Sequence, residues 1–454
     1  MSLQDVVDNK QMKTVKQNQN QVAVAGAIAP NGEPQPSVFK LDADCWDEVF
    51  DCLSLEDVHS FGQTCKAFQH VTGTYFQWQY EATTFGFGLD GFGYRGNRMV
   101  GFSKFARKIN LAIHSVGEWL PYVDLNCESV EHLTFALVDF SQMETNLIEH
   151  LGNILKKVRS LELLGCECDR DILGPLIESC AKLERMTCYG TPPSGWTNRD
   201  YPTLQHMDLA GNGFFGTKKF REFLAHCPNI RSLAVDARVF WKARRSILNF
   251  NVELDDLAME MDPNVDIDII DVGGLLKVLH QRGFYKRLHL YSPELTSPDQ
   301  LTALPGLVTL YTESEEITEI PVLPNIKEFG IVDGDAPDID TNALAIKFLN
   351  LQHLFITKPS FTEILPFIGR SKKLEDIEIA EYQGTVLDIA ALNKERKKLA
   401  GARKVIIYVG EDVYLATKWA TTETSLELIE LKRKQSRKMI RPHSFWTDFR
   451  TFDC

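Results

Sequence analysis

Two overlapping glycine motifs are the pattern in this 454-residue sequence that comes nearest to a nucleotide-binding site. The spacing G-x-G-x-x-G occurs at Gly86, Gly88 and Gly91, and again at Gly91, Gly93 and Gly96. A dinucleotide site needs this motif between a strand and a helix, because the pyrophosphate binds at the helix N-terminus. Here a helical segment precedes the motif, and no long apolar helix opens after its last glycine. The pattern therefore predicts an irregular linker whose aromatic residues pack on the element that follows.

Acidic side chains gather in a second region, where calcium binding is the chemistry to consider. They are Asp255, Asp256, Glu260, Asp262, Asp266, Asp268 and Asp271. A calcium loop needs oxygen ligands at alternating positions around a central glycine, and that order is absent. The cluster therefore favours a solvated loop before a helix, and a negative patch that selects a basic partner is the functional alternative.

Ten cysteines are scattered along the chain, most of them beside apolar residues. The one close pair, Cys166-Glu-Cys168, lacks the second pair or the histidine that a zinc site needs. We therefore expect reduced, buried thiols in a reducing compartment, and no structural metal. No G-x-S-x-G or H-E-x-x-H motif is present and the eleven histidines are dispersed, so neither intrinsic catalysis nor a cofactor is expected.

The segment from Leu41 to Trp78 carries a helical period. A first apolar face is formed by Cys45, Trp46, Val49, Phe50 and Leu53, and a second by Val58, Phe61, Cys65 and Phe68. Ser54 is a plausible N-cap between the two faces, because acidic residues follow it in the first turn. Three short helices bury too little apolar surface to be stable alone, so this bundle is expected to need a partner.

This segment resembles an F-box, with which it aligns without a gap from Leu41 to Trp78. Two positions depart from the motif: Asp42 stands where proline usually follows the first leucine, and Phe68 stands where tryptophan is commoner. The resemblance implies docking on a Skp adaptor, and Asp42 would weaken the first contact. The residues that the resemblance assigns to this contact are Leu41, Trp46, Val49, Phe50, Leu53, Asp57, Val58, Cys65, Lys66, Phe68 and Trp78. Which of them face the adaptor and which form the core of the bundle stays open at this point.

Twelve segments of the type LxxLxL follow, with helical stretches between them. Their fourth positions are 133, 161, 186, 207, 233, 257, 288, 310, 329, 354, 377 and 405. The intervals run from 19 to 31 residues, and most of them fall within the leucine-rich-repeat period of about 20–29 residues. Each unit cannot bury its apolar face alone, so stacking predicts an α/β fold: a curved solenoid with a parallel sheet on its concave face.

Strand alternation directs the side chains between the core positions into the concavity. In the later repeats these side chains are His289, Tyr291, Tyr311, Phe355 and Tyr408. Exposed aromatic residues on a rigid sheet are typical of binding hot spots, so we expect these five residues to bind the substrate. In the alternative, a C-terminal helix over residues 412–440 covers them. Early concave residues such as Glu162 and Thr187 are expected to contribute little.

Composition limits the classes of partner. Hydrophobic residues make up 44% of the chain, charged residues make up 24%, and the formal net charge is −13. An acidic chain is a poor general nucleic-acid binder, and no stretch approaches the roughly 20 apolar residues of a membrane span. No signal-like apolar region opens the sequence, so a cytoplasmic or nuclear location is expected, without nucleic-acid or membrane partners.

The predicted organisation has five parts: a disordered leader (1–38), an F-box helical domain (39–80), a glycine- and aromatic-rich linker (81–108), the leucine-rich-repeat solenoid (109–411), and a C-terminal helix and tail (412–454). The basic run 431–441 is predicted to be a solvated helix face, with a nuclear-import signal as the alternative.

The resemblance to F-box proteins with leucine-rich repeats implies a non-catalytic substrate-recognition subunit of an SCF-type (Skp–cullin–F-box) E3 ubiquitin ligase. The F-box would bind the Skp adaptor and, through it, the cullin and RING subunits. The repeats would hold a protein substrate for ubiquitination and proteasomal degradation. One alternative is a repeat scaffold or inhibitor that binds the Skp adaptor without driving degradation. An enzyme with a hidden site is a third hypothesis, which rests only on the glycine motifs and the acidic cluster.

Overall fold

The computed structural model of the chain describes residues 41–81, 83–87, 94–95, 100–113, 116–167, 172–192, 195–211, 216–250, 252–261, 269–291, 299–313, 320–332, 340–421 and 426–434. The chain divides into two compact units. The helical unit comprises Met1–Glu81 with Arg98–Phe102, and the repeat unit comprises Ala82–Asn97 with Ser103–Cys454.

The helical unit contains helices α2 (Ala43–Asp51), α3 (Leu55–Gly62) and α4 (Lys66–Gln79). Side chains cap the first two helices: Asp42 Oδ1 accepts from the backbone N–H of Cys45 at 2.9 Å, and Ser54 Oγ accepts from that of Asp57 at 3.1 Å. The predicted cap at Ser54 is therefore confirmed. Asp42 thus satisfies a backbone N–H group of the first turn of α2, which has no partner within the helix.

Aromatic side chains fill the core of the helical unit. The ring of Trp46 stacks on Phe50 at a centroid distance of 5.4 Å, and Tyr75 packs 5.1 Å from Phe50. The Tyr75 hydroxyl donates to Asp51 Oδ1 at 2.8 Å, which ties α4 to the end of α2. A Cβ atom on Gly62 would overlap with the Thr72 side chain, so glycine at this position allows α3 to pack closely on α4.

The described strands of the repeat unit form one sheet of sixteen strands, and every neighbouring pair is parallel. From β16 to β3 the strands follow in reverse chain order, and β1 then lies between β3 and β2. The strands are β1 (Thr84–Phe87), β2 (Tyr94–Arg95), β3 (Lys108–Ala112), β4 (His132–Ala136), β5 (Ser160–Leu164), β6 (Arg185–Tyr189), β7 (His206–Leu209), β8 (Ser232–Asp236), β9 (Leu254–Glu260), β10 (Tyr285–Tyr291), β11 (Leu307–Glu313), β12 (Glu328–Val332), β13 (His353–Ile356), β14 (Asp376–Ile379), β15 (Val405–Val409) and β16 (Ile429–Arg433).

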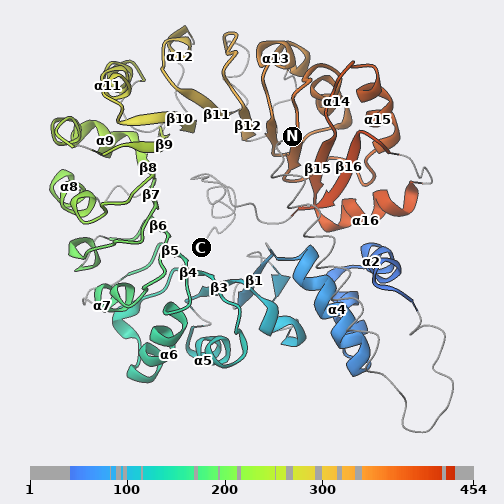
Figure 1. The fold of residues 1–454 in the computed structure, drawn as a ribbon, viewed down its shortest axis with the longest axis horizontal. Coiled ribbons are helices and arrows are strands. Elements are labelled where there is room, and N and C mark those ends of the chain that lie inside the picture. The colour runs from blue at the N-terminus through green and yellow to red at the C-terminus, as the bar shows by residue number, and fades with distance from the viewer. Residues whose placement is uncertain are drawn as a thin grey trace, which may run out of the picture. The chain divides into compact units, whose positions relative to one another are not determined.

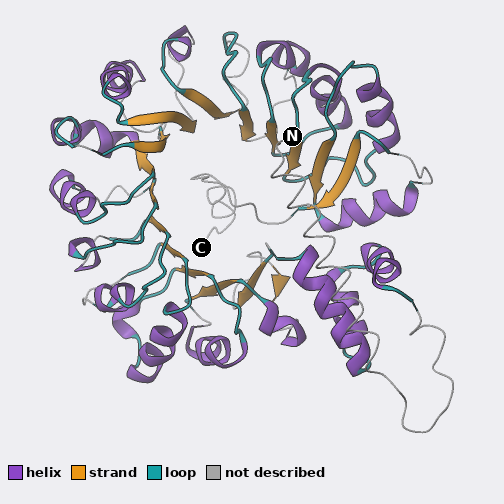
Figure 2. Ribbon diagram, in the orientation of Figure 1, coloured by secondary structure: helices purple, strands orange, loops and turns teal. Residues whose placement is uncertain are grey.

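Within the repeat unit the strands line the inner side of the curve and the helices lie on its outer side (Figures 1 and 2). The helices are α5 (Val116–Asn126), α6 (Thr145–Leu155), α7 (Leu173–Glu178), α8 (Thr217–Ala225), α9 (Ala237–Lys242), α10 (Arg244–Ile247), α11 (Ile269–Gln281), α12 (Asp299–Thr302), α13 (Thr341–Lys347), α14 (Phe361–Arg370), α15 (Ile389–Lys397) and α16 (Glu411–Ala420). Short 3-10 helices are η3 (Val100–Phe105), η4 (Phe140–Gln142) and η5 (Gly195–Asn198).

The repeat period places the core between strands and outer helices. The fourth positions of all twelve segments that the sequence marked as repeats lie in strands β4 to β15, one in each strand. Leu161 lies beside Met186 and Leu163 beside Cys188 in neighbouring strands, and all four side chains are buried. The chain therefore folds as a leucine-rich-repeat solenoid with a parallel sheet on its concave face, as predicted.

Three local expectations are wrong. The segment 81–108 is not wholly irregular, because β1 and β2 add two strands to the sheet there. The last helix ends at Ala420 instead of continuing to residue 440, and the chain forms β16. Ile429 and Leu431 are buried there while Glu430 and Lys432 alternate with them, which is the period of a strand.

The third expectation concerns the acidic cluster. Asp255, Asp256 and Glu260 lie in β9, and Asp256 and Glu260 are buried, so they are not part of a solvated loop. Strand pairing on both sides of β9 overrides the loop character of a charged sequence. Other residues of these patterns lie outside the described part of the chain: Gly88, Gly91, Gly93, Gly96, Asp262, Asp266, Asp268, the leader 1–38 and the tail beyond 434.

Candidate functional site

The residues that carry the F-box resemblance divide into two sets in the helical unit. Trp46, Phe50 and Val58 are buried, with exposed fractions of 6%, 0% and 0%. Their rings and side chains form the aromatic core, so they hold the helices together and have little surface left for a partner. Leu53 and Phe68 are partly buried, and the Phe68 ring packs 4.2 Å from Phe61.

The second set remains on the surface. Leu41, Val49 and Trp78 keep 38%, 43% and 50% of their surface exposed. Asp57, Cys65 and Lys66 are also exposed, and Asp57 accepts a hydrogen bond from the Ser54 hydroxyl at 2.7 Å. The sequence pattern could not separate these two sets, because both follow the same helical period.

A further part of the helical unit was missed by the sequence reasoning. Residues 100–102 follow β1 and β2 in the sequence but belong to the helical unit. The Phe102 ring stacks on Phe76 at 4.6 Å, and the backbone N–H of Gly101 donates to His59 Nε2 at 3.0 Å. Burial lowers the pKa of His59, which favours the neutral ring that accepts this bond. The signal that could have found this contact is the aromatic Phe102 just after the glycine-rich segment.

On the concave face, register places the predicted aromatic residues in one row. Tyr291, Tyr311, Gly330, Phe355, Glu378 and Tyr408 lie beside one another in successive strands, and His289 belongs to the neighbouring row. The ring centroids of Tyr291 and Tyr311 are 5.2 Å apart, and those of Tyr311 and Phe355 are 5.8 Å apart. The structure therefore brings four of the five predicted residues together.

Their exposure differs from the prediction. Tyr291 and Tyr311 are only 2% and 1% exposed, and they belong to an apolar cluster with Ala210, Ala234 and Ala258. Phe355, Tyr408 and His289 are partly buried. The expectation of freely exposed tyrosines is wrong at positions 291 and 311, because ring-to-ring packing and small alanine neighbours enclose these side chains.

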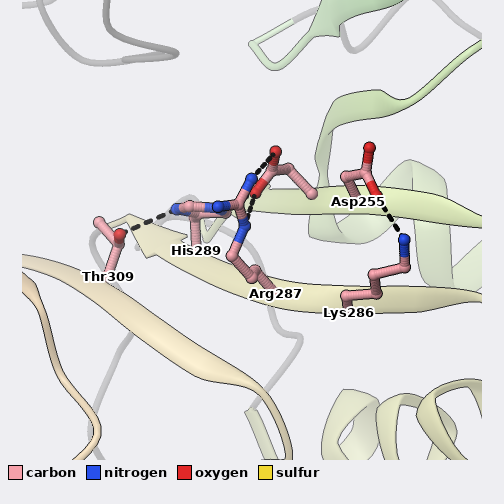
Figure 3. A network of polar contacts seen from close by, with 6 residues as sticks. Asp255, Lys286, Arg287, His289 and Thr309 are labelled. Atoms are coloured by element: carbon pink, nitrogen blue, oxygen red, sulfur yellow. Dashed lines mark hydrogen bonds and ion pairs between the residues drawn. The ribbon is translucent and has the colours of Figure 1, made fainter. Parts of the chain in front are cut away.

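His289 lies at the centre of a polar network that joins three strands (Figure 3). Its Nε2 lies 2.9 Å from Asp256 Oδ1 in β9, and its Nδ1 lies 2.8 Å from Thr309 Oγ1 in β11. Arg287 donates to both oxygens of Asp256, at 2.6 and 2.7 Å, and Lys286 pairs with Asp255 at 2.6 Å. Burial alone would raise the pKa of the Asp256 carboxyl, but the bonds from His289 and Arg287 lower it to about 2.

A carboxylate, an imidazole and a hydroxyl in this order are the components of a hydrolytic triad. Thr309 is only 2% exposed, so its hydroxyl has no open side from which a substrate could be attacked. The network lies where the pairing of β10 with β11 shifts register, between Leu288 and His289. We assign it the role of holding the three strands together at this irregularity.

A second set of polar concave residues lies in the early repeats. Asn110, Thr134, Glu162, Thr187 and Asp208 are neighbours in the successive strands β3 to β7. The Thr134 hydroxyl donates to Glu162 Oε2 at 2.9 Å, and the backbone N–H of Ala210 donates to Asp208 Oδ1 at 2.9 Å. Sequence reasoning placed Glu162 and Thr187 on this face and gave them no role in binding.

The residue types that bind metal ions are not grouped together in the described part of the chain. Within it, no group of three or more His, Cys, Asp or Glu side chains could hold a metal ion. Among the described cysteines, Cys127, Cys166, Cys180, Cys188 and Cys227 are buried, and Cys45, Cys52 and Cys65 are exposed. In the same part of the chain, every helix is too short or too polar to cross a bilayer.

The sequence matches no family model and no curated protein. Three solved structures share features of the fold. The complex of Rad7 and Elc1 in yeast is 14% identical over 96% of this chain and 99% of that chain, with a TM-score of 0.33. The Toll–Spätzle complex of Drosophila is 11% identical over 66% and 46%, with a TM-score of 0.21. A leucine-rich-repeat protein of Leptospira interrogans is 13% identical over 66% and 89%, with a TM-score of 0.18. Similarity at this level does not indicate a shared function or partner.

Proposed function

We propose that this protein is the substrate-recognition subunit of an SCF-type E3 ubiquitin ligase. The observation that carries the proposal is the division of the F-box-like positions in the helical unit. Trp46 and Phe50 build its core, while Leu41, Val49 and Trp78 keep 38%, 43% and 50% of their surface exposed. Apolar side chains that a small fold leaves on its surface support a role in binding another protein.

The proposed mechanism needs no catalytic residue in this chain. The helical unit binds the Skp adaptor, and the adaptor joins the cullin and RING subunits. The repeat unit binds a protein substrate and holds it near the ubiquitin-charged E2 enzyme. Holding two reactants together converts a bimolecular transfer into a nearly intramolecular one, and this proximity is the contribution of the chain.

The test is adaptor binding by the full chain and by matched variants. We expect Val49→Asp to weaken binding of the purified Skp adaptor at least tenfold, because it places a charge on an apolar contact. Val278→Asp is the control, because Val278 is 44% exposed on α11 in the repeat unit, close to the 43% of Val49. Equal adaptor binding by both variants and the wild type would contradict the proposal.

A second measurement separates a ligase subunit from a scaffold that binds the adaptor alone. Proteins that bind the repeat unit are identified by affinity purification, and their half-lives are measured with and without a proteasome inhibitor. A ligase subunit shortens the half-life of a bound protein, and the inhibitor restores it. A scaffold leaves the half-life unchanged although adaptor binding is intact.

A further inference from the structure

One stretch of this acidic chain carries a strong excess of positive charge. Residues 217–250 contain eight lysine and arginine residues and only two acidic ones, while the whole chain has a formal net charge of −13. The stretch forms α8, β8, α9 and α10, so its helices belong to consecutive repeats. In Figure 1, α8, α9 and α11 follow one another on the outer side of the curve. Most of this charge is therefore carried by helices on the outer side of the repeat unit.

The centre of this charge is one face of α9 and α10. Arg238, Lys242 and Arg245 follow one another at intervals of four and three residues, and hydrogen bonds of helical spacing continue through Ala243, which joins the two helices. Residues at these intervals lie on one face of a helix. All three basic residues are exposed to solvent. They therefore form a row of positive charge on the surface of the repeat unit.

The two acidic residues of the stretch have other partners. Glu222 pairs with Lys218 in α8, at 3.8 Å. Asp236 is only 9% exposed, and its carboxylate accepts from the backbone N–H groups of Arg238 and Val239, at 2.7 and 3.1 Å, as the N-cap of α9. Within the described residues, none of the three basic side chains of the row forms an ion pair. Like charges at helical spacing destabilise a helix, so the row favours an anion that offsets the repulsion.

A fourth basic side chain of these helices is held in place before any partner binds. The Arg244 guanidinium lies 4.5 Å from the centre of the Trp241 ring, and its Nη1 donates to the Trp241 carbonyl at 2.9 Å. Both residues are partly buried. A guanidinium has five N–H donors, and a side chain that is already ordered loses less entropy when it binds. This arginine is therefore prepared to donate to an acceptor from outside the chain.

The neighbouring helices extend the positive surface on both sides. Arg221 in α8 and Lys277 in α11 are exposed, and neither forms an ion pair within the part of the chain that the structure describes. Packed helices lie about 8–10 Å apart, so three consecutive ones span about 20 Å. An extended chain covers this distance with about six residues, at about 3.3 Å per residue. The surface is thus large enough for a short peptide segment.

We propose that this surface binds an acidic segment of a partner protein, rich in aspartate and glutamate. Its residues, called the outer basic surface, are Arg221, Arg238, Lys242, Arg244, Arg245 and Lys277. Carboxylates match the paired donors of a guanidinium group, and such bonds are stronger than those between neutral groups. The proposal goes beyond the proposed function, because it uses neither the F-box-like positions nor the concave face.

Two other anionic partners fit less well. Nucleic acid presents a long array of phosphates, which the net charge of −13 repels outside this surface. A membrane-bound helix combines basic residues with a large apolar face. On the described parts of α8 to α11, Val278 is the one large apolar side chain that is exposed. An acidic peptide segment needs only the local charge.

Binding of a defined peptide to the purified full chain tests this surface. The probe is a fluorescently labelled peptide of alternating glutamate and serine, which at about twelve residues is long enough to span the surface. The same peptide with glutamine in place of glutamate is the neutral control. We expect the glutamate peptide alone to bind, and the variant Arg238→Gln/Lys242→Gln/Arg245→Gln to bind it about tenfold more weakly. Glutamine is a good helix former, so these exposed substitutions keep α9 and α10 folded.

A matched variant controls for net charge. Lys182→Gln/Lys327→Gln/Lys394→Gln removes the same number of charges at exposed positions outside the outer basic surface. We expect this variant to bind the glutamate peptide as the wild type does. Binding should also be lost at about 1 M salt, where the Debye length is about 3 Å. Equal loss in the two triple variants, or no binding of the glutamate peptide by the wild type at low salt, would overturn the proposal.

Three further probes separate the other possible occupants. Tighter binding of duplex DNA, or of vesicles containing phosphatidylserine, that is lost in Arg238→Gln/Lys242→Gln/Arg245→Gln would assign the surface to that ligand and overturn the proposal. Peptide binding that appears only in Asp262→Asn/Asp266→Asn/Asp268→Asn would assign it to the chain's own acidic segment, with the same consequence. Because no adaptor is present, these results and those on adaptor binding can fail independently of each other.

Discussion

The ring of Tyr311 lies across Gly330, its neighbour in the next strand, so closely that a Cβ atom on Gly330 would overlap with the ring. The Tyr311 hydroxyl donates to Glu328 Oε1 at 2.6 Å, and the ring packs 5.8 Å from that of Phe355. Glycine at position 330 thus makes the space in which an aromatic side chain on the concave face becomes buried. The pair explains why a position expected to be exposed is instead part of an apolar cluster.

Gly330→Ala should destabilise the repeat unit by about 1–3 kcal/mol, because the new methyl group forces the Tyr311 ring out of its position. The measurement is the urea midpoint of unfolding, followed by tyrosine fluorescence. Gly274→Ala in α11 is the control, because outside its chain neighbours and the nearby backbone of its own helix no atom lies within 4 Å of the added Cβ. Alanine is the better helix former by about 1 kcal/mol, so the control should be neutral or slightly stabilising. An unchanged midpoint for Gly330→Ala would show that the ring moves aside without loss.

Arg396 is a fully buried guanidinium whose partners are all backbone carbonyls. It donates to the carbonyl oxygens of Ile368, Ser371, Lys372, Leu374 and Arg403. Arg396→Lys should destabilise the chain by about 3 kcal/mol, because an ammonium has three donors and cannot reproduce the planar fork. Lys394→Ala, an exposed position of the same helix, should change stability by less than about 0.5 kcal/mol. Thermal unfolding of the two variants checks the contrast, and equal melting temperatures would contradict it.

The lowered pKa of Asp256 predicts that the stability of the chain depends on pH. Its folded-state pKa of about 2 is below the value of about 3.9 in an unfolded chain. The stabilisation from ionised Asp256 is therefore fully present above about pH 4–5 and is lost as the pH falls toward 2. We expect Asp256→Asn to lower the free energy of unfolding at pH 7 by about 1–2 kcal/mol. The free energies of unfolding at pH 7 and pH 3 should then differ less in this variant than in the wild type.

The adjacent residue supplies the control for this prediction. Asp255 also carries an ion pair, with Lys286, but its carboxyl is exposed to solvent. Asp255→Asn should therefore have the smaller effect, since water screens the pair. Urea unfolding at several pH values measures both variants. A pH profile of Asp256→Asn that parallels the wild type would mean that the carboxyl is not ion-paired in solution.

Much of the fold could be predicted from the sequence because its determinants are local. Leu161 and Leu163 fit the repeat period, and stacking of identical units fixes their neighbours Met186 and Cys188. The burial of Tyr311 could not be predicted in this way, because it depends on Gly330 in another strand. Arg396 stands among the charged residues 394–398, a pattern that does not indicate burial, and only the approach of α14 and its following turn surrounds it with carbonyl groups.

For the candidate sites, too, the sequence predicts local features but not contacts between distant residues. Helical spacing identified the apolar positions of the F-box-like segment, but the period is shared by Phe50 in the core and Val49 on the surface. On the concave face, alternation placed Glu162 and Thr187 correctly. The hydrogen bond from the Thr134 hydroxyl to Glu162 became visible only when the strands were aligned side by side, since it joins residues that are distant in sequence.

The contacts of Phe102 indicate that the helical unit needs residues beyond 81 for its stability. Its ring stacks on Phe76 in α4 at 4.6 Å and lies 5.1 Å from the ring of His59 in α3. Phe102→Ala would leave a cavity between these two helices, which costs about 3–5 kcal/mol in a buried core. A unit of three short helices has little stability to lose, so we expect it to open while the repeat unit stays folded.

Limited proteolysis with mass spectrometry measures this outcome in the full chain. In Phe102→Ala the first cleavages should fall within residues 43–79, and adaptor binding should fall with them. Phe105→Ala is the matched control, because Phe105 lies in the same 3-10 helix but is only partly buried and belongs to the repeat unit. The helical unit should resist protease in this control as it does in the wild type. If Phe102→Ala also leaves the helices protected, the returning segment only touches the bundle, and residues 41–81 form its whole core.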